Sequence, residues 1–307
     1  MLTAKVTPAL ISSSVISVPP LARDADGNIS VAQNERIIRY LERGGISTLL
    51  YGGNANLYHV RLSEYAALLQ QLSDLAGPST WVIPSAGPAY GTLIDQARVL
   101  RDFPSFPTVM VLPQREIADS AGIATGIARF AEACGRPIVL YLKHDRWLDV
   151  AHAAKLDRDG VVSMVKYAVV RDDAADDAYL RELLEKIPAE RIVSGMGEQP
   201  AIVHMRQFGL AGFTSGCVCV APRLSQSMLV ALQHGEDQRA EQIRQQFEAL
   251  EAVRNDVNPI RVLHRAVEVA GVAETGQLSP LLSDVDPATV ERIRNACGPL
   301  LKAEQSL

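Results

Sequence analysis

The sequence predicts an α/β protein, a (β/α)₈ TIM barrel with a C-terminal helical extension. Eight short β-rich runs occur before about residue 220, amphipathic helical patterns lie between them, and only helical patterns follow Pro222. Strict alternation of strand and helix favours parallel strands joined by right-handed crossovers, and eight such units close into a barrel. An open doubly wound sheet is the alternative.

The expected strands share apolar and β-branched residues. They are 13–17, 47–51, 81–84, 108–112, 137–141, 161–166, 191–194 and 212–216. The segments between them carry apolar residues three and four positions apart, such as Ile37, Ile38 and Leu41 after the first strand. Each strand is therefore expected to lead into a helix.

The end of the chain is predicted to be helical. Helices are expected at 224–234, 237–253 and 260–269, and a last one opens with Asp286 as N-cap and Pro287 at the first helical position. No linker, low-complexity tract or repeat separates this region from the rest. We expect residues 1–222 to form the barrel and 223–307 to pack on it as part of a single structural unit.

Composition excludes several classes of protein. The chain has 307 residues, 48% hydrophobic and 21% charged, and lacks the roughly 18 consecutive apolar residues of a membrane span. A net charge of −5 without a basic cluster argues against nucleic-acid binding. Four cysteines in a chain of this length do not make a disulfide framework, which favours the cytoplasm. The mildly apolar start reads as a strand rather than a signal peptide, since it has a proline, several serines and no clear cleavage site.

Lys166 lies in the apolar run VVSMVKYAVV. On a strand it shares one face with Val162, Met164 and Ala168. Burial disfavours the charged form of an amine and can lower a lysine pKa by roughly 3 to 5 units. A neutral lysine can attack the ketone of a 2-oxo acid, and the resulting protonated imine draws electrons from C3. Lys166 is thus the candidate nucleophile.

Two further features are expected beside Lys166, because active sites of such barrels form at the C-terminal ends of the strands. Tyr141 ends the neighbouring strand and could shuttle a proton. The loop GGNAN at 52–56 follows the second strand, and its glycines let backbone N–H groups converge on an anion. Asn54 or Asn56 could add a side-chain amide.

Each of these signals also has an ordinary structural interpretation. The lysine could extend to solvent, the tyrosine could simply pack, and the loop could be a tight turn. Cys217 and Cys219 are expected on one strand face, where small buried apolar groups explain them better than zinc ligands do. No set of converging ligands predicts a metal site.

The order of these features resembles the dihydrodipicolinate synthase and N-acetylneuraminate lyase family of class I pyruvate-type aldolases and dehydratases. The likeness runs from SVPPLARDADGNIS at 17–30 to NPIRVLHRAVEVAG at 258–271. In that family a strand-five tyrosine precedes an arginine by five residues, and YLKHDR places Tyr141 and Arg146 there. The resemblance implies that Lys166, in MVKYAV, is the Schiff-base lysine.

Two later segments also match the family. VSGMGE at 193–198 resembles its glycine loop after strand seven, and GLAGFTSGCVCVAP at 209–222 resembles its strand eight and the following turn. The resemblance implies that Gly195 and Ser215 contact the substrate. SGMGE could instead bind a phosphate, since barrels often do so after strands seven and eight.

Departures from the family pattern imply a changed substrate. The family loop GTTGE is GGNAN here, so Gly53 and Asn54 replace two threonines that bind the keto-acid carboxylate and relay a proton. After strand four, LPQRE lacks the second tyrosine of the family and supplies Arg115. We expect Gly52, Gly53 and Asn54 to hold a carboxylate, while Arg146, with Arg115, meets a second polar or anionic end.

The sequence therefore predicts a Schiff-base-forming lyase acting on a 2-oxo acid, by aldol cleavage or condensation or by dehydration of a 2-keto-3-deoxy sugar acid or related compound. The chemistry needs no cofactor beyond the covalent imine through Lys166. The resemblance implies a homo-oligomer, a tetramer or a dimer. Two alternatives remain open: a catalytically silent or regulatory keto-acid-binding homologue, and a phosphate-binding barrel isomerase.

Overall fold

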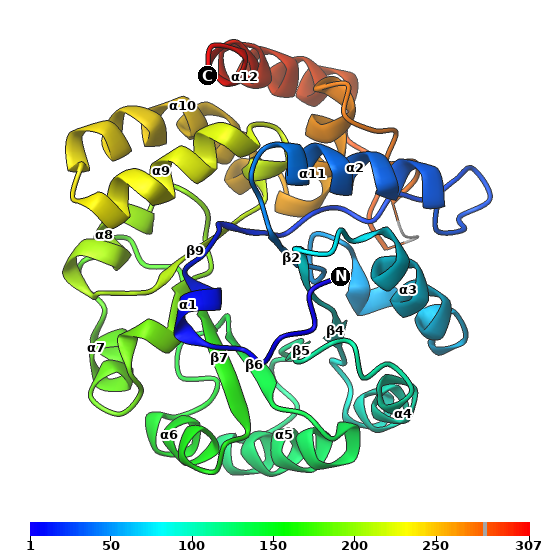
Figure 1. The fold of residues 1–307 in the computed structure, drawn as a ribbon, viewed down its shortest axis with the longest axis vertical. Coiled ribbons are helices and arrows are strands. Elements are labelled where there is room, and N and C mark those ends of the chain that lie inside the picture. Colours follow the sequence, from blue (N-terminus) through cyan, green and yellow to red (C-terminus); the bar gives the residue numbers. More distant parts are fainter. Residues whose placement is uncertain (279–280) are drawn as a thin grey trace.

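The computed structural model describes residues 1–278 and 281–307, and within them nine parallel strands form a nearly closed barrel ringed by helices (Figure 1). The strands are β1 (Ile16–Ser17), β2 (Thr48–Leu50), β3 (Trp81–Ile83), β4 (Ser85–Ala86), β5 (Val109–Val111), β6 (Ile138–Leu142), β7 (Val162–Tyr167), β8 (Ile192–Ser194) and β9 (Gly212–Ser215). Their order is β3-β2-β1-β9-β8-β7-β6-β5-β4. Because β1 pairs with β9, the first and last strands meet, and the open-sheet alternative is wrong.

The eight predicted strand runs are confirmed, and an additional short strand, β4, follows the third run. Pro84 separates β3, which pairs with β2, from β4, which pairs with β5. Proline has no N–H to give to a ladder, and here its carbonyl accepts from the N–H of Met110 at 2.8 Å. The third strand therefore changes partner at the proline.

Helices follow the strands as predicted, and one short helix, α1 (Pro8–Ile11), precedes β1. The others are α2 (Val31–Arg43), α3 (Leu62–Leu75), α4 (Tyr90–Arg101), α5 (Ser120–Cys134), α6 (Val150–Arg158), α7 (Ala178–Leu184) and α8 (Ala201–Gln207), with 3₁₀ turns η1 (Leu57–His59), η2 (Ala189–Arg191) and η3 (Cys217–Cys219). Several begin at an N-cap side chain that accepts the N–H three residues on, as Ser30, Asp119 and Asp177 do. Ile37, Ile38 and Leu41 of α2 are buried, as their spacing predicts.

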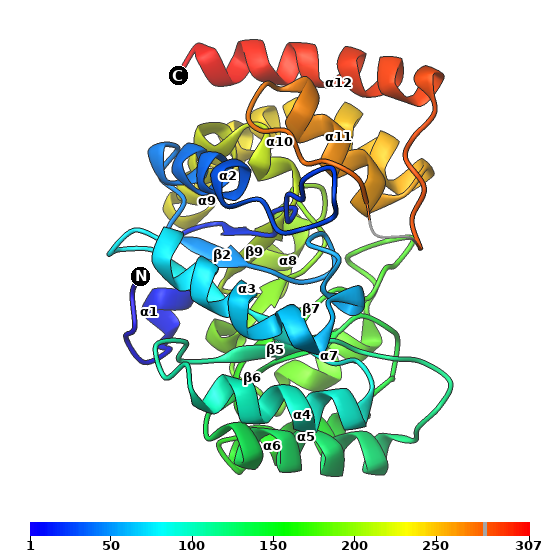
Figure 2. The ribbon, with the colours of Figure 1, turned by 90° about the vertical axis from the view of Figure 1, so that its right-hand side faces the viewer.

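The extension consists of α9 (Pro222–His234), α10 (Asp237–Asp256), α11 (Pro259–Val269) and α12 (Pro287–Gln305). In Figure 2, α12 lies outermost, beyond α10 and α11. Asp286 caps α12 as predicted, accepting the N–H of Thr289 at 2.8 Å. Near the other end of α12, the buried carboxylate of Glu304 accepts the N–H groups of Arg223 and Leu224 at 3.0 and 2.9 Å. The last helix thus caps the first turn of α9.

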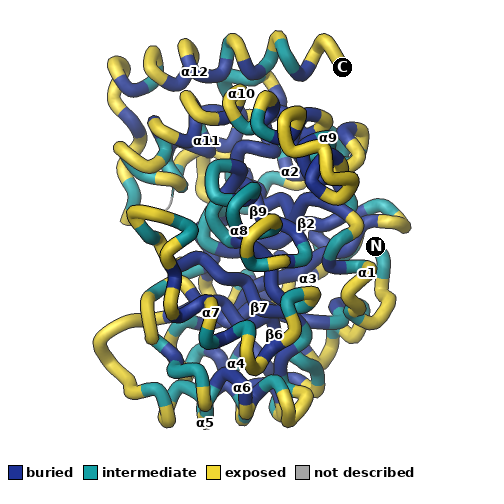
Figure 3. The backbone as a smooth tube through the Cα atoms, turned by 90° about the vertical axis from the view of Figure 1, so that its left-hand side faces the viewer, coloured by how far each residue is buried: buried dark blue, intermediate teal, exposed yellow. Residues whose placement is uncertain are grey.

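The core runs through the barrel and under the helices, while exposed residues follow the outer helix faces and the loops (Figure 3). Cys217 and Cys219 are buried in η3, so the expectation that they share a strand face is wrong: strand β9 ends at Ser215. Burial raises the pKa of Cys219 to about 12, and the thiols act as small apolar groups. Among the described residues, no helix is both long and apolar enough to cross a membrane.

Candidate active site

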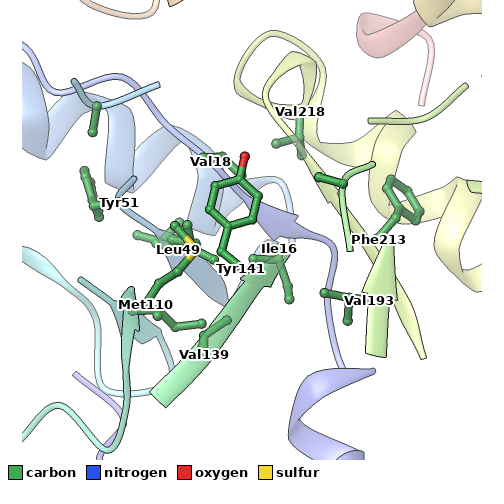
Figure 4. Close-up of a cluster of buried hydrophobic side chains, with 14 of the residues drawn as sticks. Ile16, Val18, Leu49, Tyr51, Met110, Val139, Tyr141, Val193, Phe213 and Val218 are labelled. Atoms are coloured by element: carbon green, nitrogen blue, oxygen red, sulfur yellow. The ribbon is translucent and has the colours of Figure 1, made fainter. Parts of the chain in front are cut away.

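Lys166 and Tyr141 face each other inside the barrel. They are paired in register on the neighbouring strands β7 and β6, and the Nζ atom of Lys166 lies 4.4 Å from the centroid of the Tyr141 ring. Lys166 is 4% exposed and Tyr141 is 9% exposed. Figure 4 shows Tyr141 rising from β6 among buried side chains that include Leu49, Met110 and Val139. The two predicted catalytic residues therefore share one buried space.

The environment of Lys166 disfavours its charge. Burial, followed by the positive charges of Lys143 and Arg254, lowers the pKa of Lys166 to about 7. No carboxylate pairs with the amine within residues 1–278 and 281–307. The face of the tyrosine ring is its closest compensating group when it is charged. A large fraction of the amine is thus neutral near pH 7.

Tyr141 keeps its proton in this setting. Burial raises the pKa of the Tyr141 phenol above its usual range, so the hydroxyl remains a donor. A protonated phenol beside a neutral amine is a pair that can exchange protons with a bound reactant.

The opposite face of β7 fixes the direction of Lys166. Tyr167 follows it and points outward, and its hydroxyl donates to the buried carboxylate of Asp177 at the start of α7. Because successive side chains alternate along a strand, this anchor turns Lys166 inward.

Gly195, after β8, lies directly beside Lys166. A Cβ atom there would come within 2.7 Å of the Ala168 Cβ and 3.1 Å of the Lys166 Cγ. Only glycine lets the backbone approach this closely. Gly195 therefore serves the packing of the lysine stem, and its expected contact with the substrate stays a prediction.

The GGNAN loop closes over the same end of the barrel. Asn54 donates through Nδ2 to the carbonyl of Val18 at 2.9 Å, and its own carbonyl accepts from Nε2 of His264 at 2.9 Å. A Cβ on Gly52 would meet the Met110 Cε at 2.7 Å, so a larger residue there would have to displace the methionine methyl group. Within the described chain, the N–H groups of Gly53 and Asn54 have no hydrogen-bond acceptor. These two donors are available to an anion.

Arg146 and Arg115 are not brought to this place. Arg146 is 48% exposed and donates through both terminal nitrogens to Glu182, at 2.9 and 2.6 Å. Its guanidinium lies over the ring of Tyr179 on α7, 5.5 Å from the centroid. Arg115 is exposed in the loop after β5. The family spacing that suggested Arg146 does not place its charge beside Lys166.

Ser215 also points elsewhere. Its hydroxyl donates to the buried carboxylate of Glu198 at 2.8 Å. Glu251 of α10 in turn accepts the N–H groups of Glu198 and Gln199, at 2.9 and 3.1 Å. These donors of the loop after β8 already hold an internal carboxylate. The structure therefore gives no support to the expectation that SGMGE binds a phosphate.

Two basic residues that sequence reasoning missed lie near the candidate site. Arg254, in the last turn of α10, and Lys143, directly after β6, both depress the pKa of Lys166. Neither residue stands out in the sequence, since each sits in a polar stretch with other charged residues. Within the described residues, no group of three His, Cys, Asp or Glu side chains could hold a metal ion.

One cavity lies away from these groups. It has a volume of about 610 Å³ and opens where β7 begins, between the N-terminal segment and residues such as Pro137 and Val162. Arg136 in its wall already donates hydrogen bonds to four backbone carbonyls. Neither Lys166 nor Tyr141 lines this cavity, and barrel active sites form at the other end of the strands.

Comparisons with known proteins agree on one family. The model of the dihydrodipicolinate synthetase family matches residues 12–293. Similar structures include a dihydrodipicolinate synthase from Bacillus clausii, at 21% identity and a TM-score of 0.82, covering 97% of this chain and 100% of that one. The synthase from Oceanobacillus iheyensis gives 19% and 0.81, with coverages of 98% and 99%. A catalytic lysine mutant of the Ruminococcus gnavus sialic acid aldolase gives 16% and 0.83, with coverages of 97% and 98%. No curated protein matches the chain.

Proposed function

Since the chain belongs to the dihydrodipicolinate synthetase family, whose fold indicates a class I pyruvate-dependent aldolase or lyase, we propose that it acts on a 2-oxo acid through an imine of Lys166. One observation carries this proposal: a buried lysine with a pKa of about 7 lies against the ring of a protonated tyrosine. The sialic acid aldolase of similar fold has a catalytic lysine, which agrees with this role.

The chemistry follows from the two side chains. The neutral amine of Lys166 attacks the ketone carbon, and the carbinolamine loses its oxygen as water when Tyr141 supplies a proton. The protonated imine then accepts electrons from C3. Cleavage of the C3–C4 bond gives aldol chemistry, whereas loss of a C3 proton followed by departure of a neighbouring hydroxide gives dehydration. Both routes regenerate the amine by hydrolysis.

The free N–H groups of Gly53 and Asn54 are proposed to hold the carboxylate of the 2-oxo acid. Backbone donors fixed in advance stabilise an anion without reorganising when it binds. We propose a 2-keto-3-deoxy sugar acid or a related compound as the substrate. The reaction needs no cofactor, and we expect a cytoplasmic homo-oligomer, as is common in the family.

A silent keto-acid-binding homologue is the second candidate, and one observation favours it. Gly53 and Asn54 carry no hydroxyl, so the proton relay that two threonines provide elsewhere in the family is missing. Such a protein would form the imine with Lys166 and release the acid unchanged. The two candidates are separated by a turnover assay, without borohydride, on each 2-oxo acid that forms a trapped adduct.

The central test is reduction of the imine. Borohydride is added with pyruvate or a 2-oxo sugar acid, and the modified peptide is identified by mass spectrometry. We expect an adduct on Lys166 in the wild type and none at that position in Lys166→Met. Lys155→Met, which removes an exposed lysine of α6, is the matched control and should retain the adduct. Absence of an adduct with every 2-oxo acid would refute the proposed function.

A further inference from the structure

Arg254 is an arginine without a carboxylate partner at the C-terminal end of the barrel. Its Nη1 lies 3.6 Å from the Cys217 sulfur and its Nε lies 3.5 Å from the carbonyl of Pro259, both weak contacts. Within the described residues it forms no ion pair. A guanidinium carries five donors, so most of the hydrogen-bonding capacity of Arg254 is unused.

The local sequence would pair Arg254 with a glutamate, but the fold prevents it. In α10 and just before it, Arg239 pairs with Glu236 and Arg244 pairs with Glu241, each three residues earlier. Glu251 has the same spacing to Arg254, yet its carboxylate is bound to the loop after β8. The missing pair is therefore a result of tertiary structure and leaves the guanidinium available to a ligand.

Gly216 leaves room for the Arg254 guanidinium beside the proposed carboxylate site. A Cβ atom on Gly216 would lie 2.8 Å from Nη2 of Arg254 and also 2.8 Å from Nδ2 of Asn54. The guanidinium and the GGNAN loop are thus near neighbours, and both present N–H donors. A planar guanidinium matches a carboxylate through two parallel hydrogen bonds.

Lys143 supplies a second unpaired charge on the other side of Lys166. It lies two residues after Tyr141, just past the end of β6, and is exposed to solvent. Its Nζ lies 5.9 Å from the ring centroid of Tyr58, and Tyr58 also approaches Gly53. Within the described chain Lys143 has no ion pair, and neighbouring atoms lower its pKa by desolvation.

The order of the barrel separates these two charges. Lys143 follows β6, next to β7 on one side, whereas Arg254 lies against the turn after β9, two strands away on the other side. Three basic groups near one another repel, and an anionic ligand relieves that repulsion. A second anionic group on the ligand would give Lys143 a partner of its own.

We propose that the site takes a 2-oxo acid with a second anionic group, whose C1 carboxylate binds Arg254 and the GGNAN loop while its distal anion binds Lys143. This inference rests on the proposed function, because the ketone between the two ends is the group that Lys166 attacks. The substrate class is a dianionic 2-oxo acid, such as a dicarboxylate.

Matched acids test the distal charge. The half-saturation concentration for borohydride trapping is measured with 2-oxopentanoate against 2-oxoglutarate, and with 2-oxohexanoate against 2-oxoadipate. We expect at least one dianion to saturate at about tenfold lower concentration than its partner, as a charged hydrogen bond predicts. Lys143→Met should abolish that preference, measured as the ratio of the two half-saturation concentrations within the variant, because loss of this charge also changes the pKa of Lys166 for both acids alike. Lys155→Met is the control and should behave as the wild type.

Two variants test the C1 carboxylate site. Arg254→Gln and Gly216→Ala should each raise the half-saturation concentration of every 2-oxo acid about tenfold or more, the second by displacing the guanidinium without removing it. Arg98→Gln, at an exposed position of α4, is the matched control. Far-UV circular dichroism and thermal unfolding establish that each variant is folded, and Arg254→Lys should recover part of the affinity if Gln destabilises the chain.

The outcomes separate the two proposals. Trapping on Lys166 with equal half-saturation for the matched acids overturns the dianion inference and leaves the imine proposal standing. Absence of any adduct overturns the proposed function. In that case, binding of 2-hydroxyglutarate, a dianion without a ketone, is measured by calorimetry and tests the dianion site independently of the imine. Binding that is lost in Lys143→Met and Arg254→Gln supports that site, and unaltered or absent binding overturns it.

Discussion

At the residue scale, the charge of one amine controls the proposed reaction. Because the pKa of Lys166 is about 7, the neutral fraction rises about tenfold between about pH 6 and about pH 8. We expect the rate of adduct formation with pyruvate and cyanoborohydride to follow that rise and then level off. A rate that continues to rise toward pH 10 would show that the pKa of Lys166 is close to its ordinary value of 10.5.

The same amine should reduce stability. The pKa of Lys166 falls from 10.5 to about 7 on folding, so the folded chain binds fewer protons between these values and stability rises with pH across that window. Below about pH 7 the amine is charged in both states, and the free-energy cost of burying that charge reaches its full value. At about 1.4 kcal/mol per unit, Lys166→Met should stabilise the protein near neutrality by up to about 4 kcal/mol. Urea unfolding at pH 7 and pH 10 measures this, and the gain should shrink at the higher pH.

Tyr141→Phe should separate binding from proton transfer. The ring that lies against Lys166 is retained, and the hydroxyl is lost. We expect turnover to fall about 100-fold or more, within the range for a general acid, while the trapped adduct still forms slowly. Equal turnover in the variant and the wild type would remove the phenol from the mechanism.

Individual residues were predicted unevenly by the sequence. The proximity of Lys166 and Tyr141 could be predicted, because a charged residue in an apolar strand and a tyrosine ending the next strand are local patterns, whereas their catalytic roles stay predictions. Arg254 could not, since its spacing to Glu251 is the same as that of two surface ion pairs in α10. Arg146 was misplaced because it lies four residues past the end of β6, in a loop that lets its side chain leave the barrel and meet Glu182.

At the element scale, a carboxylate of α12 caps α9. Glu304→Ala removes the acceptor for the N–H groups of Arg223 and Leu224, and it should cost about 1 to 2 kcal/mol in the free energy of unfolding. Glu291→Ala in the same helix breaks only an exposed ion pair with Arg294 and should cost far less. Urea unfolding of both variants checks this, and equal costs would contradict the capping role.

A buried acid pair joins α10 to the loop after β8. Burial raises the pKa of both Glu198 and Glu251 above the usual 4.5. The folded state then binds more protons than the unfolded one above that pH, so stability declines as pH rises through the raised values. Glu198→Gln removes one ionisable group and should flatten the dependence of Tm on pH. If Tm changes with pH by the same amount in the variant and the wild type between about pH 5 and about pH 9, the prediction is wrong.

Elements were predicted more fully than residues. All eight strand runs and the four helices of the extension were found, because periodicity and caps are local signals. The change of strand partner at Pro84 and the 3₁₀ turn of Cys217 were not found, since both depend on which strands lie alongside.

At the scale of the whole molecule, we predict a single cooperative unit. Met228, Leu229 and Leu232 of α9 and Phe247 of α10 are fully or almost fully buried, so residues 1–222 alone would expose an apolar surface. The full chain should unfold in one transition that coincides by tryptophan fluorescence and circular dichroism, whereas the 1–222 fragment should not fold cooperatively. Two separate transitions in the full chain would show that the helices form an independent domain.

The absence of a side chain at Gly216 has a consequence for comparing related sequences. A branched side chain there would occupy the volume that the guanidinium of Arg254 fills, so the two positions have to change together. Glycine at the first position with arginine at the second is therefore a two-residue signature by which relatives with the proposed selectivity could be distinguished from other members of the family.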